Sequence, residues 1–230
     1  IFKPRDHRLT AAIESYDLCR GGRLIEIGAA YGFFCEQVRE LGLFDEIVAM
    51  EPTPDLAEYC ESLGFDTLAL PYEEVEPEQK FDAIAHFEVI EHLFDPHHFL
   101  QWCLQMLKPG GSMIFSCPNI GGLETMVAGK ESNTGDHEHI NLFSTESIQV
   151  LLKQVGFEIV DVSATGVLDI DLLNRYLEQG LIDEQDIDPA IFKLITHSDP
   201  TVQSEFLSVL QKAGMTSNMT VIAAKPAILL

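Results

Sequence analysis

The chain has 230 residues, 46% hydrophobic and 22% charged, with a formal net charge of −23 at pH 7. This length and balance predict one globular domain with a sizeable core. The negative charge disfavours tight non-specific binding to nucleic acid or to an anionic membrane surface, because such binding needs lysine and arginine. We find neither a signal-peptide pattern nor a run near the roughly 18 apolar residues that a membrane helix needs.

Apolar runs closed by turn residues alternate with segments of helical spacing along most of the chain. Such short runs are typical of buried strands in a parallel sheet. The predicted strands are residues 24–27, 46–50, 66–69, 81–86, 112–117, 157–162 and 219–224. The predicted helices are residues 10–19, 33–41, 55–63, 95–107 and 144–155. This alternation predicts an α/β fold with a mostly parallel sheet and helices on both faces.

Two segments interrupt the alternation. Residues 120–139 are glycine-rich and polar, and we expect them to form a mobile loop or lid. Residues 168–213 are acidic and mainly helical, and they are too long for a turn. We expect a helical insertion within a single domain of residues 1–230, serving as a substrate cap or as a contact between the subunits of a homodimer.

The five cysteines are scattered, without a Cys-x-x-Cys pair. Reduced thiols in the core of a cytoplasmic protein therefore fit better than disulfides or a zinc site.

The first predicted strand ends in the pattern Glu26-x-Gly28-x-x-x-Gly32, and a helix follows. Glycine lets the chain bend sharply and lets a ligand approach the backbone without meeting a Cβ atom. A strand, a glycine turn and a helix are typical of nucleotide-binding sheets, but the three-glycine spacing of nicotinamide dehydrogenases is absent. Glu26 lies inside an apolar strand, so we expect a cationic or hydrogen-bond-donating partner for its carboxylate.

Glu51 stands at the end of the second predicted strand. An acid at this place in a nucleotide-binding sheet accepts hydrogen bonds from both ribose hydroxyls. The alternative is an ordinary surface acid at the end of a strand.

Four motifs, residues 26–32, Glu51, residues 81–84 and residues 107–111, together resemble the class I S-adenosylmethionine-dependent methyltransferases. The resemblance spans about residues 20–164 and returns at the last strand. It implies a Rossmann-like open sheet of seven strands, one of them antiparallel, that holds S-adenosylmethionine at the carboxyl ends of the strands. The cofactor contacts that it implies are Glu26, Gly28, Ala29, Tyr31, Gly32, Glu51, Pro52, Pro71, Tyr72, Glu73, Phe87 and Glu88.

The stretch His86 to Leu93 resembles a branch of this class that contains ubiquinone-biosynthesis O-methyltransferases and bacterial glycan and natural-product enzymes. In a helical turn, Glu88, Glu91 and His92 would share one face. Two carboxylates and an imidazole in that arrangement suit a divalent cation such as Mg²⁺. The resemblance adds a distant histidine, for which His139 is the candidate.

The alternative is that Glu91 and His92 only brace the turn below the cofactor. In that case His92, His137 or His139 is expected to take the proton of the acceptor hydroxyl as a general base. The predicted catalytic residues are therefore His92, His139 and Glu88.

The leading hypothesis is methyl transfer from S-adenosylmethionine to a hydroxyl of a small molecule, sugar or glycan. Oxygen as the acceptor rests on the branch resemblance alone. One alternative is an RNA 2′-O-methyltransferase with a Glu-Glu-His-His metal site, against which the net charge and the missing basic stripe argue. Another is a non-catalytic cofactor-binding module of a larger protein, and the chain does begin with Ile1 rather than Met.

Overall fold

The computed structural model describes residues 21–227 except 77–79, 136, 168 and 197–198. The predicted helix at residues 10–19, and Cys19 with it, lie outside the described residues. Within the described ranges, no helix combines the length and the apolar content that crossing a membrane requires.

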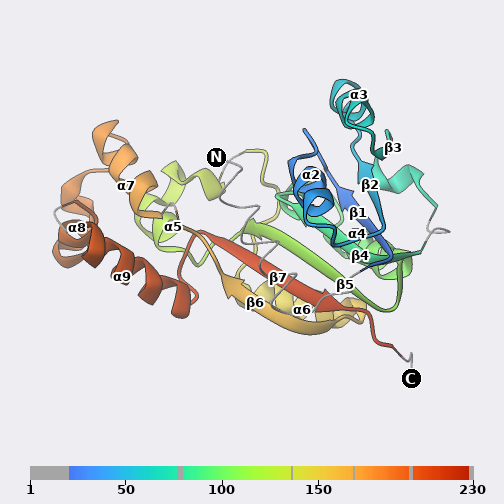
Figure 1. Ribbon diagram of the computed structural model, residues 1–230. Helices are drawn as coiled ribbons and strands as arrows, with labels where there is room; N and C mark the ends of the chain where they lie inside the picture. The colour runs from blue at the N-terminus through green and yellow to red at the C-terminus, as the bar shows by residue number, and fades with distance from the viewer. Residues whose placement is uncertain (1–20, 77–79, 136, 168, 197–198, 228–230) are drawn as a thin grey trace.

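Seven strands form one sheet in the order β3-β2-β1-β4-β5-β7-β6 (Figure 1). They are β1 (Arg23–Ile27), β2 (Glu46–Met50), β3 (Asp66–Leu68), β4 (Phe81–Phe87), β5 (Leu107–Pro118), β6 (Glu158–Ala164) and β7 (Asn218–Ala224). β7 runs antiparallel to both of its neighbours, whereas the pairings among β1 to β5 are parallel. The predicted sheet with one antiparallel strand is confirmed. Its order reverses between β1 and β4, which is where open α/β sheets bind ligands at the carboxyl ends of their strands.

Helices cover both faces because the strands alternate their apolar side chains. Leu24 packs with α2 (Phe33–Glu40), and the same face is covered further along by α3 (Pro54–Ser62). Ile25 and Ile27 point the other way, toward α4 (Pro96–Met106) and α6 (Thr145–Val155). The period of two along a strand thus produces two apolar layers.

The segment at residues 107–111 differs from the predicted helix over residues 95–107 and strand over residues 112–117. The helix ends at Met106, and these residues already belong to β5. Phe81 pairs with Leu107 but Ala83 with Ser112, so the extra residues form a bulge. Gly111 is needed there, because a Cβ atom would lie 2.9 Å from the carbonyl oxygen of Lys108.

The expectation of a loop at residues 120–139 is partly wrong. This segment contains α5 (Leu123–Ala128) and two short 3-10 turns, Gly129–Glu131 and Asn133–Gly135. Leu123 and Ala128 are buried against the helical insertion. Tertiary packing therefore orders a segment whose glycines indicated a loop.

The insertion before β7 is helical and has an apolar core of its own. It comprises α7 (Asp169–Glu178), a 3-10 turn (Glu184–Asp186), α8 (Pro189–Thr196) and α9 (Pro200–Lys212). Leu173, Ile195 and Leu210 join the residues of α5 in this core. Figure 1 shows α5, α7, α8 and α9 grouped together at one end of the sheet.

The four cysteines at positions 35, 60, 103 and 117 are buried and form no disulfide. Burial raises the pKa of each of the four thiols. They are therefore protonated core residues, as expected for that part of the chain.

His86 of β4 is completely buried, stacked on Phe115 and in edge contact with Phe99. Neither of its ring nitrogens has a hydrogen-bond partner among the described residues. Burial lowers the pKa of this imidazole from 6.5 to about 3. The folded chain therefore keeps it neutral at pH values where the unfolded chain protonates it.

We expect His86 to weaken the fold as the pH falls from its unfolded pKa of 6.5 toward 3. Between these values the unfolded state binds one more proton, so the free energy of unfolding decreases by about 2 kcal/mol from this group at pH 5. His86→Phe should remove this contribution. Urea unfolding of both proteins at pH 7 and pH 5 tests this, and an equal loss of stability in both would contradict it.

Candidate active site at the carboxyl ends of the strands

The turn from Gly28 to Gly32 is held against the end of β2. The backbone amides of Gly28 and Ala29 both donate to the carbonyl oxygen of Met50, at 2.8 and 3.1 Å. Gly28 has a φ of +72°, and a Cβ atom there would lie 2.8 Å from Cγ2 of Val89. Gly32 has a φ of +66°. Both glycines are therefore favoured by the backbone, and Gly28 lets the turn lie close to the segment that follows β4.

Glu51 is fixed to the same turn. Its carboxylate accepts hydrogen bonds from the backbone amides of Ala30, at 2.8 Å, and Thr53, at 2.9 Å. The residue is only 5% exposed, whereas Pro52 beside it is exposed. Each carboxylate oxygen has a second lone-pair site, so Glu51 retains the capacity to accept hydroxyl donors.

Glu26 has a donor partner, as its place inside an apolar strand predicts. The thiol of Cys35 on α2 donates to its Oε2 at 2.9 Å. Burial, and then the nearby charge of Glu26, raise the pKa of that thiol well above its usual value, so it remains a donor. Glu26 thus lies beneath the glycine turn, toward α2.

Glu88 does not share a helical face with Glu91 and His92, and that expectation is wrong. The 3-10 turn contains only Ile90–His92, and Glu88 precedes it with a φ of +55°. Its Oε1 accepts from Ser116 Oγ of β5 at 2.7 Å and from Asn218 Nδ2 of β7 at 2.9 Å. These bonds hold Glu88 over the ends of β5 and β7, outside the group formed by Glu91, His92 and His139.

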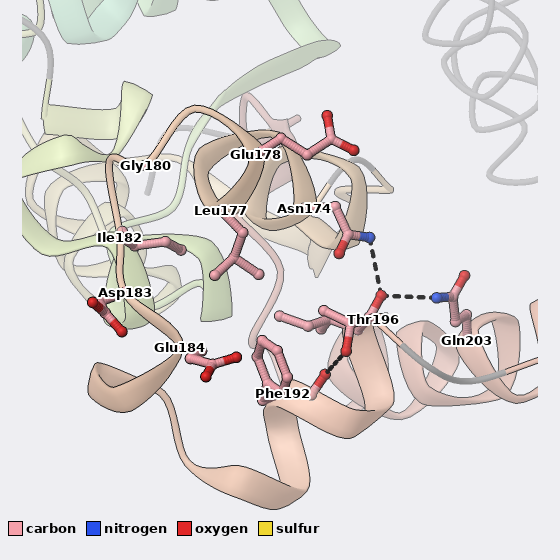
Figure 2. Close-up of a pocket in the computed structure, with 11 residues that line it drawn as sticks. Asn174, Leu177, Glu178, Gly180, Ile182, Asp183, Glu184, Phe192, Thr196 and Gln203 are labelled. Atoms are coloured by element: carbon pink, nitrogen blue, oxygen red, sulfur yellow. Dashed lines mark hydrogen bonds between the residues drawn. The ribbon is translucent and has the colours of Figure 1, made fainter.

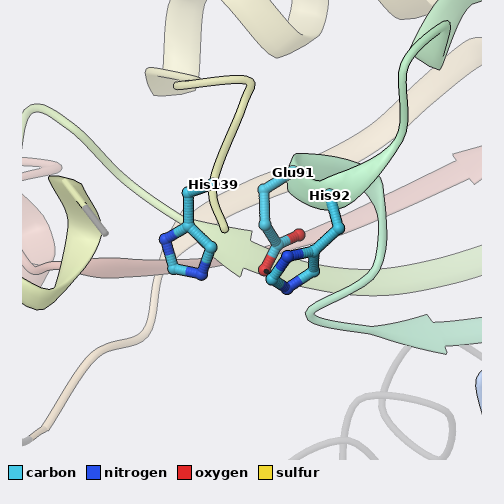
Figure 3. A group of neighbouring side chains, drawn as sticks. All are labelled: Glu91, His92 and His139. Atoms are coloured by element: carbon cyan, nitrogen blue, oxygen red, sulfur yellow. Dashed lines mark ion pairs between the residues drawn. The ribbon is translucent and has the colours of Figure 1, made fainter. Parts of the chain in front are cut away.

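Glu91, His92 and His139 come together, with their candidate ligand atoms within 4.8 Å of one another. Figure 3 shows Glu91 and His92 on one short turn and His139 on a separate segment. His92 Nε2 lies 3.9 Å from Glu91 Oε1, and the two imidazole rings are 4.9 Å apart between centroids. The Glu91 side chain is completely buried, and His92 is exposed.

Backbone carbonyls orient both imidazoles. His92 Nδ1 is 3.0 Å from the carbonyl oxygen of Glu138, and His139 Nδ1 is 3.1 Å from that of Thr134. A carbonyl only accepts, so each Nδ1 carries a proton, and in the neutral imidazole the lone pair is then on Nε2. Metal-binding histidines have this arrangement. Together with the carboxylate of Glu91, the donor set fits a divalent cation.

Other groups that support this site have no signal in the sequence. The backbone amide of Asn141 donates to the carbonyl oxygen of Glu91 at 3.0 Å, and its Nδ2 donates to that of Leu93 at 2.6 Å. Asn141 therefore holds the Glu91 turn against the segment that carries His139. Most of these acceptors are main-chain carbonyls, which every residue type supplies.

The remaining predicted cofactor residues differ in exposure. Tyr31 is half exposed and touches the rings of Phe33 and Tyr59. The ring of Phe87 packs on Phe34 of α2. Pro71 is half-buried and Glu73 exposed.

Tyr72, by contrast, points into the core. It is 6% exposed, it lies edge-on to Phe99 and Trp102, and its hydroxyl is 3.3 Å from His98 Nδ1. Burial raises the pKa of Tyr72 to about 12. Its ring therefore serves packing.

A pocket of about 740 Å³ lies in the helical insertion, and none of the predicted site residues lines it (Figure 2). Asn174 of α7 and Gln203 of α9 both donate to the carbonyl oxygen of Ile195, each at 2.9 Å. Leu177 and Phe192 line it and also pack against the insertion's core. The pocket is thus a feature of how these three helices pack.

A family profile described as a methyltransferase domain matches residues 5–162. The chain is 33% identical over 108 residues to the ubiquinone biosynthesis O-methyltransferase of Bradyrhizobium diazoefficiens, which covers 44% of this chain and 42% of that protein. It is 28% identical over 158 residues to the enzyme of the same name from Cereibacter sphaeroides, covering 61% and 62%. The chain thus spans less than two thirds of the length of these relatives.

Solved structures show the same fold. A SAM-dependent methyltransferase from Archaeoglobus fulgidus superposes with a TM-score of 0.64 at 19% identity, covering 97% of this chain and 94% of that one. Phosphoethanolamine N-methyltransferase 2 from Haemonchus contortus, in complex with S-adenosyl-L-methionine, gives 0.66 at 18% identity and covers 96% and 52%. The [4+2]-cyclase SpnF gives 0.64 at 17% identity and covers 97% and 81%.

The chain belongs to the methyltransferase domain family, as a class I S-adenosylmethionine-dependent member. The fold alone does not choose the acceptor atom, because an N-methyltransferase and a cyclase share it.

Proposed function

We propose that the protein transfers the methyl group of S-adenosylmethionine to a hydroxyl oxygen of a small molecule, sugar or glycan. The observation that carries the proposal is the group of Glu91, His92 and His139 at the carboxyl ends of the strands. The similarity to proteins named ubiquinone biosynthesis O-methyltransferase supports oxygen as the acceptor.

The cofactor half of the proposed site is built by the glycine turn and Glu51. The turn from Gly28 to Gly32 receives the methionine part, and Glu51 accepts hydrogen bonds from the ribose hydroxyls. Of the predicted adenine contacts at residues 71–73, Tyr72 has its ring buried in the core. The adenine contacts are therefore assigned to Pro71 and Glu73.

The acceptor half is built by Glu91, His92 and His139, which would hold a divalent cation such as Mg²⁺. When bound, a cation of this kind lowers the pKa of a hydroxyl that reaches it. The Nε2 atoms of His92 and His139 face the same space and provide the place for the hydroxyl proton if no cation is used. Glu88, held by Ser116 and Asn218, orients the acceptor beside the sulfonium, and alignment supplies most of the remaining acceleration.

The RNA alternative uses the same residues. However, the net charge is −23, with 14 lysines and arginines against 37 acidic residues, so few positive charges are available to neutralise a phosphate backbone. We therefore favour a small acceptor.

The test is release of S-adenosylhomocysteine with a panel of catechols, sugars, amines and an RNA 3′ end. We expect release with catechols or sugars and none with the RNA, loss of turnover with a chelator and recovery with added Mg²⁺. Full turnover after chelation would contradict a role for the cation, and the histidines would then act as general bases. Release with amines alone would contradict oxygen as the acceptor.

A further inference from the structure

We propose that Tyr176 and Glu124 are positioning residues, through which the helical insertion holds the imidazole of His139 in place. The inference rests on the proposed function, since it concerns how one of the proposed cation ligands is held. It assigns a role to α7, which contains none of the site residues predicted from the sequence.

The carboxylate of Glu124 on α5 is completely buried and joins two parts of the chain. Its Oε1 accepts from the hydroxyl of Tyr176 on α7 at 2.8 Å. Its Oε2 accepts from the hydroxyl of Ser132 at 2.7 Å. A buried carboxylate is costly unless such donors stay in place, so α5, α7 and Ser132 are held together.

The same hydroxyls hold the backbone that leads to His139. Tyr176 accepts from the amide of Asn133 at 3.1 Å, and Ser132 accepts from the amide of Thr134 at 3.0 Å. The carbonyl oxygen of Thr134 then accepts from Nδ1 of His139 at 3.1 Å. An unbroken series of hydrogen bonds therefore runs from α7 to the imidazole.

The insertion is a firm support for this series. Tyr176, Ser132 and Thr134 are all less than 10% exposed, and Tyr176 shares an apolar core with Leu123 of α5. Burial raises the pKa of Tyr176 to about 12, so its hydroxyl stays a donor. At the start of α7, Asp169 accepts from the amide of Ser217 at 2.8 Å, which ties the helix to the residue before β7.

The direction of the His139 ring decides whether its Nε2 meets Glu91. Both imidazoles of the site are oriented by carbonyls. The carbonyl that orients His139 belongs to Thr134, in a 3-10 turn that side chains of other elements fix. Loss of the Tyr176 hydroxyl releases two of these bonds at once, because it both donates to Glu124 and accepts from Asn133.

Tyr176→Phe keeps the ring and removes only the hydroxyl, so it is the main variant. The matched control is Asn174→Leu, also on α7, which removes the hydrogen bond to the carbonyl oxygen of Ile195 inside the insertion. Titration of each protein with Mn²⁺, without cofactor or acceptor, measures the affinity for the cation. We expect Tyr176→Phe to weaken it about tenfold, as for other groups that orient a metal ligand, and Asn174→Leu to leave it unchanged.

A second measurement does not depend on a cation. Amide hydrogen exchange at Asn133 and Thr134 in the metal-free protein should speed up in Tyr176→Phe and not in Asn174→Leu. Combining Tyr176→Phe with Ser132→Ala should be less than additive in both measurements, because the two hydroxyls act through the same carboxylate.

Equal effects of Tyr176→Phe and Asn174→Leu, or full additivity with Ser132→Ala, would overturn the proposal. If the unaltered protein binds no Mn²⁺, the cation of the proposed function fails. The role of Tyr176 is then decided by hydrogen exchange and by the ¹⁵N shift of His139 Nδ1, which reports the tautomer and should change only in Tyr176→Phe.

Discussion

Replacing Glu51 by alanine should weaken binding of S-adenosylmethionine at least about 100-fold. Two hydrogen bonds from ribose hydroxyls to a carboxylate are worth about 1.5–3 kcal/mol each, and each 1.4 kcal/mol is a factor of ten. The variant also leaves the amides of Ala30 and Thr53 without their acceptor, so the glycine turn loses its anchor. Calorimetric titration with the cofactor measures the effect.

The matched control for Glu51 is Glu58→Ala, which removes an exposed acid of α3 and one negative charge. Its affinity for the cofactor should equal that of the unaltered protein. Unchanged affinity in Glu51→Ala would show that Glu51 does not bind the ribose. A drop of equal size in both variants would point to overall charge instead.

Replacing Glu91 by glutamine should reduce the affinity for Mg²⁺ or Mn²⁺ about 100-fold, because a neutral amide replaces the one carboxylate of the described donor set. The free energy of unfolding of the metal-free protein should increase or stay unchanged. Burial of a charge is costly, and the Glu91 side chain is completely buried, so removing that charge relieves the fold. Titration with the cation measures the change in affinity, and thermal unfolding of the metal-free protein measures the change in stability.

Glu138→Gln is the control for Glu91. Glu138 is an exposed acid next to His139, and it contributes its backbone carbonyl, which the substitution keeps, to His92. Its cation affinity should stay within about twofold of the unaltered value, since an exposed charge is screened. If Glu91 only braces the turn, Glu91→Gln will destabilise the metal-free protein and leave cation binding as it was.

The proposed cofactor half of the site could be predicted from the sequence because its signals are local. The apolar run of β1, the glycines at 28 and 32 and the acid that follows β2 all act within a few residues of their own position. The structure places them next to one another through the parallel pairing of β1 with β2. For Glu26 the sequence predicts a cationic or hydrogen-bond-donating partner, and only the fold shows that this partner is the thiol of Cys35.

The proposed acceptor half was only partly predictable. The family resemblance selects His139, and the structure brings it to Glu91 and His92. Helical spacing predicts Glu88 on the same face as Glu91 and His92, but its backbone has a φ of +55°. Its carboxylate accepts hydrogen bonds from Ser116 and from Asn218, which is 130 residues away along the chain. Local spacing carries no information about such a partner.

The sequence by itself determined the α/β class of fold and the glycine turn with its acid, because short apolar runs, segments of helical spacing and turn residues act locally. The antiparallel strand is implied only by the family resemblance. Only the tertiary structure decided that α5 forms, that Glu88 parts from Glu91, and that Glu124 meets Tyr176. The reason is that a short glycine-flanked helix and a buried carboxylate gain their stability from contacts between distant segments. Those contacts exist only once the sheet and the insertion have packed together.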